Sequence, residues 1–177
     1  MTTWVALLRG VNVGGITIRS ADLGALFRDL GFDGVRTVLA SGNVRFEADA
    51  EASARAELKT RIEAGLRERF GYEAWIVLVT LDELQQAIDD FPFDATDAAR
   101  QPYVVFTSDD AVRDELVAAI TDLDLGIDPA RAGIAVVYWH PAKGSSTDTP
   151  YAKLLAKARF AASTTTRNLR TLAKITG

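Results

Sequence analysis

A seven-residue segment near the start of the chain, Arg9-Gly10-Val11-Asn12-Val13-Gly14-Gly15, combines three glycines with an arginine and an asparagine. Glycine adopts positive φ without steric strain and lets backbone N–H groups approach a ligand closely. Arg9 and Asn12 add side-chain donors, and the fork of an arginine matches the oxygens of a phosphate or a carboxylate. This segment is therefore the first candidate for a ligand site, with these contacts: Arg9, Gly10, Asn12, Gly14 and Gly15.

The same segment also has a purely structural interpretation. Its glycines permit a tight strand-to-helix connection, and Asn12 can hydrogen-bond the local backbone. Its spacing is neither G-x-x-x-x-G-K-S/T nor G-x-G-x-x-G, so it lacks the patterns of a P-loop and of a Rossmann dinucleotide site. The structural interpretation and anion binding at a loop edge therefore both stay open.

Composition excludes several kinds of chemistry. The chain has no cysteine and one histidine, so disulfides, thiolate catalysis and cysteine-ligated metals are excluded, and we expect no metal and no cofactor. Its 177 residues, 48% of them hydrophobic, suffice for one domain or two small subdomains. No apolar run approaches the roughly 18 to 20 residues of a membrane span, and the N-terminus is unlike a signal peptide. We expect a cytoplasmic protein that does not bind membranes.

A few titratable residues stand apart from the glycine segment. His140 follows an apolar run and precedes Pro141, and we expect a surface or loop histidine rather than a catalytic base. Acidic pairs such as Asp109-Asp110 and Asp94/Asp97 stand near helix ends. Solvated caps are their ordinary role, and a Mg²⁺ site is the alternative.

Hydrophobic patterns predict a first subdomain over residues 1–80. A strand over 4–8 is followed by a helix over 20–30, a hairpin over 35–46, a helix over 51–70 and a strand over 74–79. The order β-α-β-β-α-β is the split βαβ of ferredoxin-like α+β folds, in which two helices cover one face of a four-stranded antiparallel sheet. The long helix also predicts three ion pairs at i,i+4 spacing: Glu51–Arg55, Glu57–Arg61 and Glu63–Arg67.

The turn of the predicted hairpin, Ser41-Gly42-Asn43, is polar. In this topology the first and third strands are the central ones, so the end of the first lies beside the start of the third. We therefore expect the Arg9–Gly15 segment to lie beside this turn. Ser41, Gly42 and Asn43 are either ligand contacts or an ordinary hairpin turn.

Residues 81–148 are expected to form a second, smaller α+β subdomain, with strands over 103–106 and 133–139. Thr80 and Glu83 fit a capping box at the start of its first helix. Thr149 followed by Pro150 fits an N-cap with proline in the first turn, and it opens a C-terminal helical segment, 149–177, that we expect to dock on the body.

This C-terminal segment is basic, although the whole chain has a formal net charge of −4. It has no acidic residue and these basic ones: Lys153, Lys157, Arg159, Arg167, Arg170 and Lys174. It forms either a solvated face paired with acidic neighbours or a face for anionic ligands. Within it, Thr165-Thr166-Arg167-Asn168 is a third polar cluster, in which a threonine N-caps a short helix or Thr166, Arg167 and Asn168 contact a ligand.

Three separated strings, Leu7–Gly15, Leu39–Val44 and Thr165–Asn168, resemble in type and order an uncharacterised bacterial family catalogued as domain of unknown function 1697. The resemblance covers essentially the whole chain and implies two ferredoxin-like subdomains, but no activity. Many relatives carry a lysine where this chain has Ile16-Thr17, and a tryptophan where it has Leu169. We therefore carry over no role for those positions.

One leading hypothesis and one alternative follow. In the first, the Arg9–Gly15 segment, the Ser41–Asn43 turn and the Thr166–Asn168 cluster meet in a cleft between the subdomains and bind a small anionic ligand, such as a phosphorylated or carboxylated metabolite. If such a site is catalytic, a transferase or hydrolase fits better than redox chemistry. In the alternative, the motifs are structural, and the basic segment of an interaction module meets an acidic protein or RNA.

Nucleic acid is the less expected of those two partners. RNA-recognition modules built on ferredoxin-like sheets need exposed aromatic residues on the two central strands and a basic face. Here those strands offer Trp4 and Phe46, and the chain is acidic.

Overall fold

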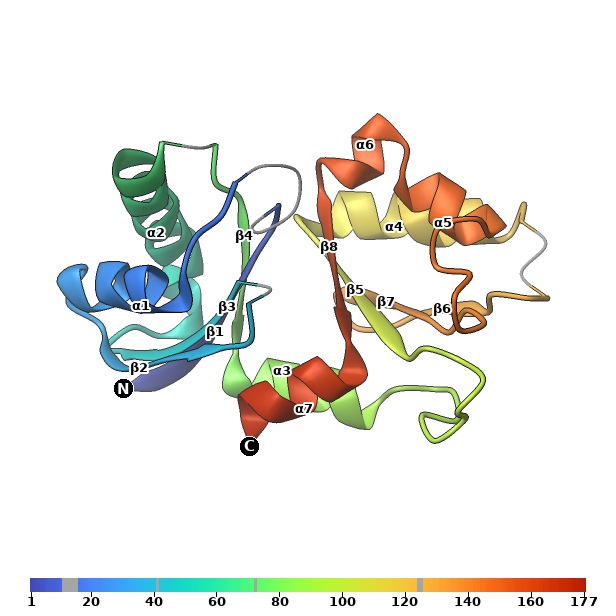
Figure 1. Cartoon of the computed structure of the whole chain (residues 1–177), viewed down its shortest axis with the longest axis horizontal. Helices are drawn as coiled ribbons and strands as arrows, with labels where there is room; N and C mark the ends of the chain where they lie inside the picture. Colours follow the sequence, from blue (N-terminus) through green and yellow to red (C-terminus); the bar gives the residue numbers. More distant parts are fainter. Residues whose placement is uncertain (11–15, 41, 72, 124–125) are drawn as a thin grey trace. The chain divides into compact units, whose positions relative to one another are not determined.

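The computed structural model describes residues 1–10, 16–40, 42–71, 73–123 and 126–177 (Figure 1). They divide into two compact units, the first made of Met1–Leu84 with Lys174–Gly177 and the second of Gln85–Ala173. Helices α3 (Leu81–Asp89) and α7 (Leu169–Thr176) each contribute residues to both units. The division between the two units therefore falls within these two helices.

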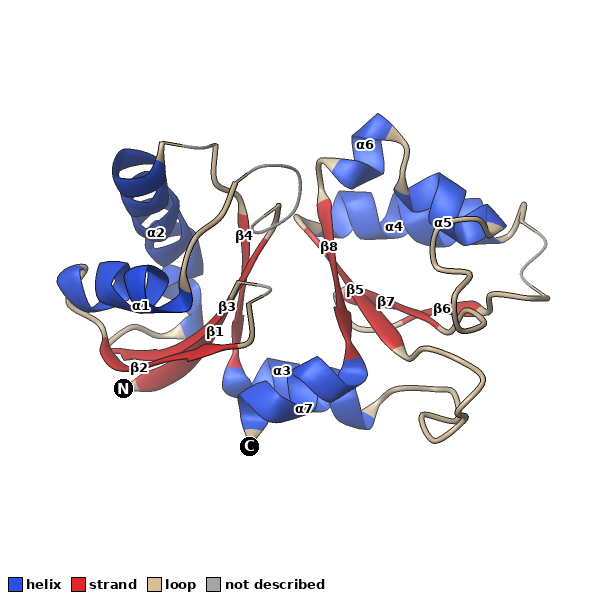
Figure 2. Cartoon of the chain, viewed as in Figure 1, coloured by secondary structure: helices blue, strands red, loops and turns tan. Residues whose placement is uncertain are grey.

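The first unit contains one antiparallel sheet of order β2-β3-β1-β4. Its strands are β1 (Thr2–Leu8), β2 (Asp33–Val38), β3 (Asn43–Ala48) and β4 (Ile76–Thr80). Helices α1 (Ser20–Asp29) and α2 (Arg55–Phe70), the latter preceded by the 3₁₀ turn η1 (Ala52–Ala54), cover one face of the sheet (Figure 2). Alternate residues of the central strands, such as Trp4 and Phe46, are buried in the core beneath them. The ferredoxin-like α+β topology predicted from the sequence is confirmed.

The second unit repeats this topology. Its antiparallel sheet has the order β6-β7-β5-β8, formed by β5 (Tyr103–Thr107), β6 (Ala130–Ala132), β7 (Val136–Trp139) and β8 (Thr164–Asn168). Helices α4 (Asp110–Ile120), α5 (Pro150–Leu155) and α6 (Ala158–Ala161) supply its covering layer (Figure 1). In both sheets the chain order of the strands is second, third, first, fourth, so the second unit is also ferredoxin-like.

Two expectations for the second half of the chain need correction. Residues 149–177 are not a helical segment, because Thr164–Asn168 forms β8 and pairs with β5 along its length. The strand expected over 133–139 begins at Val136, because residues 133–135 form the turn between β6 and β7.

The last residues of the chain are held by the first sheet. Arg45 of β3 donates from Nη1 to the carbonyl oxygens of Ile175 and Thr176, at 3.2 and 3.3 Å. Arg36, its cross-strand partner on β2, donates to the carbonyl oxygen of Gly177 at 3.1 Å. The final carbonyls of a helix have no partner within it and carry the negative end of its dipole, so the two arginines cap α7. These contacts assign Lys174–Gly177 to the first unit.

Candidate functional site

The carboxyl end of β1 lies beside the start of β3, as the topology predicted. Leu7 is paired with Asn43, and the backbone N–H of Leu8 donates to the carbonyl oxygen of Gly42 at 2.8 Å. The described parts of the glycine segment and of the hairpin turn are therefore neighbours in the first unit. We name Arg9, Gly10, Gly42 and Asn43 the β1 edge.

Arg9 is the residue of the β1 edge whose side chain is available to bind a ligand. Its backbone N–H donates to the carbonyl oxygen of Trp75 at 3.1 Å, which fixes the main chain just beyond β1. The side chain is half-buried, and its guanidinium makes no hydrogen bond or ion pair with any residue that the structure describes. Gly10 follows with φ +73°, a conformation that favours glycine, and no atom lies within 4 Å of the position a Cβ would take.

Asn43 has a structural role at this edge. Its side chain is fully buried, and its Nδ2 donates to the carbonyl oxygen of Val38 at 2.8 Å across the hairpin. The turn itself contains Leu39 with φ +58° and Gly42 with φ +78°. A buried amide that closes a turn of this kind explains an asparagine at position 43 without a ligand.

The third predicted cluster lies in β8, and none of its threonines is an N-cap. Asn168 takes that role instead, because its Oδ1 accepts a hydrogen bond from the backbone N–H of Arg170 at 2.9 Å where α7 begins. Its Nδ2 donates to Oε1 of Gln101 at 3.0 Å. Thr166, half-buried, is paired with Val105 of β5.

Arg167 is not a solvent-exposed arginine. Its side chain is 7% exposed, and Nη1 donates to Oγ1 of Thr165 at 2.7 Å and to the carbonyl oxygen of Thr166 at 3.1 Å. Burial lowers the pKa of its guanidinium. The residue therefore has partners within its own strand.

Several predicted contacts lie outside the described residues: Asn12, Gly14, Gly15 and Ser41. The predicted meeting of the first two segments with Thr166–Asn168 involves both units, and it stays a prediction.

The remaining polar candidates are mostly capping residues. Asp109 accepts a hydrogen bond from the N–H of Val112 at 2.9 Å and N-caps α4. Asp94 and Asp97 accept bonds from the N–H groups of Thr96 and Ala99, so they stabilise turns. Within the described ranges, no group of three or more His, Cys, Asp or Glu side chains could hold a metal ion, and no helix is long and apolar enough to span a membrane.

His140 lies in a loop, as expected, because it directly follows β7, but it is not a surface residue, since it is only 4% exposed. It packs against Phe91 and Phe93, with ring centroids 5.7 and 5.3 Å away. This burial is not evident from the sequence, because both phenylalanines lie in a loop far from position 140.

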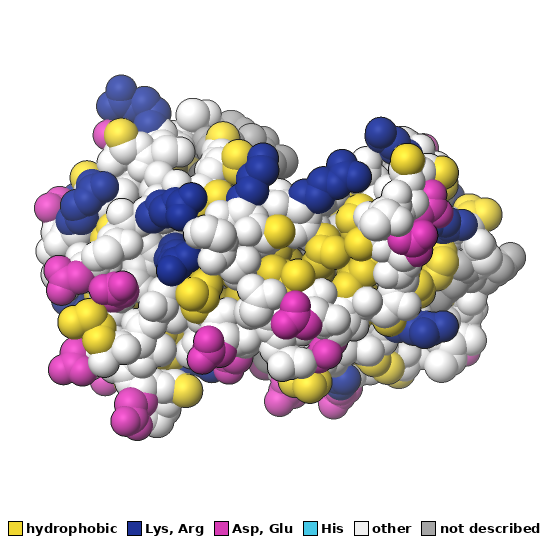
Figure 3. Space-filling view, turned by 90° about the horizontal axis from the view of Figure 1, so that it is seen from below, with side chains coloured by type: hydrophobic (Ala, Val, Ile, Leu, Met, Phe, Trp, Pro, Cys, Tyr) yellow, Lys and Arg dark blue, Asp and Glu magenta, His cyan; other side chains and the backbone are white. Residues whose placement is uncertain are grey.

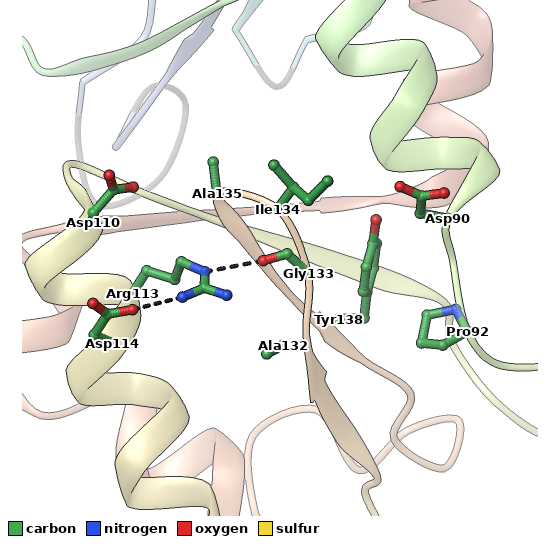
Figure 4. A pocket seen from close by; sticks show the side chains of 10 residues that line it. All are labelled: Asp90, Pro92, Asp110, Arg113, Asp114, Ala132, Gly133, Ile134, Ala135 and Tyr138. Atoms are coloured by element: carbon green, nitrogen blue, oxygen red, sulfur yellow. Dashed lines mark hydrogen bonds and ion pairs between the residues drawn. The ribbon is translucent and has the colours of Figure 1, made fainter.

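The second unit has a cavity at its own corresponding edge, where β5 ends and the β6–β7 turn lies (Figure 4). Its volume is about 590 Å³, and Asp110, Arg113 and Asp114 of α4 line one side. Arg113 crosses toward the turn, where its Nε donates to the carbonyl oxygen of Gly133 at 3.0 Å and its Nη1 pairs with Asp114 at 2.6 Å. Unlike Arg9, this arginine is tied to its own unit.

The opposite side of the cavity is closely packed. Tyr138 is buried and donates from its hydroxyl to the carbonyl oxygen of Ala87 at 2.7 Å. A Cβ on Gly133 would lie 2.4 Å from Cε2 of that ring, so only glycine fits there. Sequence analysis missed this cavity, and its one signal was a glycine within an otherwise apolar run.

Comparisons with known proteins identify a family and a fold. No curated protein matches the chain. Among solved structures, the conserved bacterial protein SP0830 from Streptococcus pneumoniae is similar, with a TM-score of 0.83 and 24% sequence identity over 99% of this chain and 97% of that one. At this identity the likeness shows the fold alone. Residues 1–138 match the family described as "Protein of unknown function (DUF1697)". The chain therefore belongs to this family of proteins of unknown function.

Proposed function

We propose that the chain binds a small anionic ligand at the β1 edge of its first unit, with Arg9 as the principal contact. The class of ligand follows from the donor: a forked, permanently charged guanidinium suits a phosphate or a carboxylate. Gly10 leaves open space next to that donor, where a side chain would otherwise stand.

One observation carries this proposal. The two units have the same topology, but the second joins its first strand to its first helix with residues 108–109, whereas the first uses residues 9–19. Such strand-to-helix connections usually take about 2 to 6 residues. The crossover therefore does not require the long glycine-rich connection, and unusually long loops on a rigid scaffold commonly carry function. This comparison weighs against the purely structural interpretation of the segment.

The state of Arg9 supports the same proposal. Arg9 is a half-buried residue, and polar groups that are partly withdrawn from water are normally hydrogen-bonded or paired. Arg9 has neither with the described residues. An anion at the β1 edge would supply the missing acceptor oxygens.

The alternative, an interaction module for RNA or an acidic protein, has less support. Trp4 and Phe46 are fully buried under the helices, so they offer no stacking surface for bases. In the basic segment, Arg159 is bonded through two nitrogens to Glu115. This is the pairing with an acidic neighbour that a solvated basic face predicts. Acidic side chains also occur among the basic ones over the face drawn in Figure 3.

The test is a titration of the whole chain with inorganic phosphate and with pyrophosphate, followed by ¹H–¹⁵N NMR. We expect saturable shifts of the Gly10, Gly42 and Asn43 amides. Replacing Arg9 with alanine should weaken binding at least about tenfold, because a charge-assisted hydrogen bond contributes roughly 1.5 to 3 kcal/mol.

Arg19 provides a matched control at the other end of the same connection. Its guanidinium is exposed and already bonded to Asp22, at 2.7 Å from Nε. The Arg19→Ala variant should bind phosphate within about twofold of the wild type, since exposed pairs contribute little. Absence of saturable binding by the wild type, or equal weakening in both variants, would reject the β1 edge as an anion site.

A further inference from the structure

Residues 91–100 of the second unit pack over the end of β7, and the contact is made by aromatic rings. The ring of Phe93 stacks on His140, with centroids 5.3 Å apart and planes 14° from parallel. Phe91 meets the same imidazole edge-on at 5.7 Å, and it meets Tyr138 at 5.6 Å. His140 is the one histidine of the chain, and it stands at the centre of this cluster.

Hydrogen bonds of this segment and of the adjacent Gln101 hold it against the residues that follow β7. The N–H of Gln101 donates to the carbonyl oxygen of Pro141 at 2.9 Å, and the N–H of Lys143 donates to that of Ala99 at 2.8 Å. Nη1 of Arg100 donates to the carbonyl oxygen of His140 at 2.9 Å. We call residues 91–100 with these contacts the latch.

The imidazole is poorly placed to carry a charge. Its side chain is 4% exposed, and Nε2 is buried without a hydrogen-bond partner among the described residues. A proton added to this ring would have no acceptor at Nε2, and a buried charge without a partner is strongly unfavourable. The pKa of His140 is accordingly lowered, mainly by burial and then by the Arg100 guanidinium.

Other charged groups around the ring act in both directions. The carboxylates of Asp97 and Asp94 favour the protonated form, but they do not reverse the effect of burial and Arg100. Asp97 lies 3.8 Å from Nε of Arg100, which partly satisfies its charge. The guanidinium of Arg131 lies 5.4 Å from the centroid of Phe93, so the ring that stacks on His140 already interacts with one cation.

We propose that the latch is proton-sensitive: protonation of His140 releases residues 91–100 from the end of β7. The open form solvates the imidazolium, which the closed form cannot do. Asp90 and Pro92 line the cavity of the second unit, so release of the latch also changes one wall of that cavity.

The experiment uses the full chain at pH values between about 7.5 and 5. Because there is a single histidine, its NMR titration needs no assignment among several rings. Backbone hydrogen exchange of Gln101 and Lys143 reports latch opening after correction for the intrinsic effect of pH. The opening constant should rise about tenfold for each unit by which the pKa of His140 is lower in the closed latch than in the open one.

The variant His140→Phe keeps an aromatic ring against Phe93 and removes the titrating group. It should hold the latch closed over the whole pH range, so that the exchange of Gln101 and Lys143 no longer increases at low pH. A wild-type pKa for His140 at or above 6.5, or exchange that does not increase with acid, would overturn the proposal. Both wild-type measurements decide the matter even if the variant fails to fold.

Discussion

The two units differ at the sheet edge where the first strand ends and the third begins. In the second unit the connection from strand to helix is short, Asp109 caps α4, and Arg113 is tied to the β6–β7 turn. In the first unit the connection runs over residues 9–19, and the Arg9 side chain has no hydrogen-bond or ion-pair partner among the described residues. Arg113 therefore has a structural role, whereas the side chain of Arg9 is available for a ligand.

Backbone strain does not distinguish the two edges. Each hairpin turn contains a non-glycine residue at φ +58°, Leu39 in the first unit and Ala135 in the second. Strain at a single turn would invite a functional interpretation. Because it occurs at both, it belongs to the way this topology closes its hairpin, and only the differences between the edges point to a ligand.

The largest expected effect is that of Gly133→Ala. The new Cβ would lie 2.4 Å from the ring of Tyr138 and 2.9 Å from Cγ2 of Val136, and the buried ring cannot move aside without repacking. We expect a loss of about 3 kcal/mol in the free energy of unfolding, measured with urea, as is typical of overpacking.

Gly10→Ala is the matched change at the other edge. It meets open space but must adopt φ +73°, so it should cost about 1 kcal/mol. Equal losses of unfolding free energy in the two variants would show that the Tyr138 ring moves aside at little cost. The two edges would then differ less than their contacts indicate.

Asn43→Ala tests whether the β1 edge uses this asparagine for structure or for the ligand. The variant removes a buried hydrogen bond to the carbonyl oxygen of Val38, so it should lose about 2 kcal/mol of stability. Phosphate binding should persist wherever the variant is folded. The opposite result, normal stability with lost binding, would make Asn43 a ligand contact.

Local signals in the sequence predicted most of the fold. Thr80 and Glu83 form the expected capping box, with reciprocal bonds of 2.9 and 3.2 Å. Thr149 N-caps α5, with Pro150 in its first turn. These features involve residues next to one another in the chain, so the sequence contains all the information they need.

Features that depend on distant residues were not predictable in this way. Within the described structure, none of the three i,i+4 pairs expected on α2 is formed: Arg55 bonds Glu83 at 2.6 Å, Arg61 bonds the carbonyl oxygen of Leu30, and Glu63 accepts a hydrogen bond from the N–H of Ile76 at 3.1 Å. Each helix pair contributes only about 0.2 to 0.5 kcal/mol, so any better tertiary partner displaces it.

For the candidate site, the sequence predicted that Arg9 lies beside Gly42 and Asn43, because strand order alone requires it. It could not show that Arg9 lacks a partner or that Arg113 has one.

Alkaline titration sharpens the description of the second unit's cavity. Burial, with a contribution from the Asp90 carboxylate, raises the pKa of Tyr138 to about 12. Since the folded value exceeds the unfolded value of about 10, the neutral hydroxyl stabilises the fold fully below pH 10, and this contribution is lost as the pH rises toward 12. At about 1.4 kcal/mol per pKa unit, the loss is at most about 3 kcal/mol.

Urea unfolding at several alkaline pH values measures this slope. Tyr138→Phe should lower stability by about 1 kcal/mol at pH 8, through the lost bond to Ala87, and should reduce the slope above pH 10. Burial also raises the pKa of Tyr151, so part of the slope remains in the variant. An unchanged slope would mean that the Tyr138 hydroxyl reaches solvent and that this wall of the cavity is open.

The smallest effects test the comparison most directly, because they concern the two arginines themselves. Arg113→Ala removes the donor to Gly133, while its partner Asp114 is 68% exposed and adds little, so stability should fall by about 1 kcal/mol. Arg9→Ala should change stability by less than about 0.5 kcal/mol, since it breaks no side-chain hydrogen bond or ion pair with a described residue. Saturating phosphate should have the opposite pattern of effects on these variants. It should raise the free energy of unfolding of the wild type and of Arg113→Ala, because a ligand that binds the folded state stabilises it. The free energy of unfolding of Arg9→Ala should stay almost unchanged, because this variant has lost the phosphate contact. If phosphate stabilised Arg9→Ala as strongly as the wild type, its binding site would not depend on Arg9, and the free arginine at the β1 edge would need another explanation.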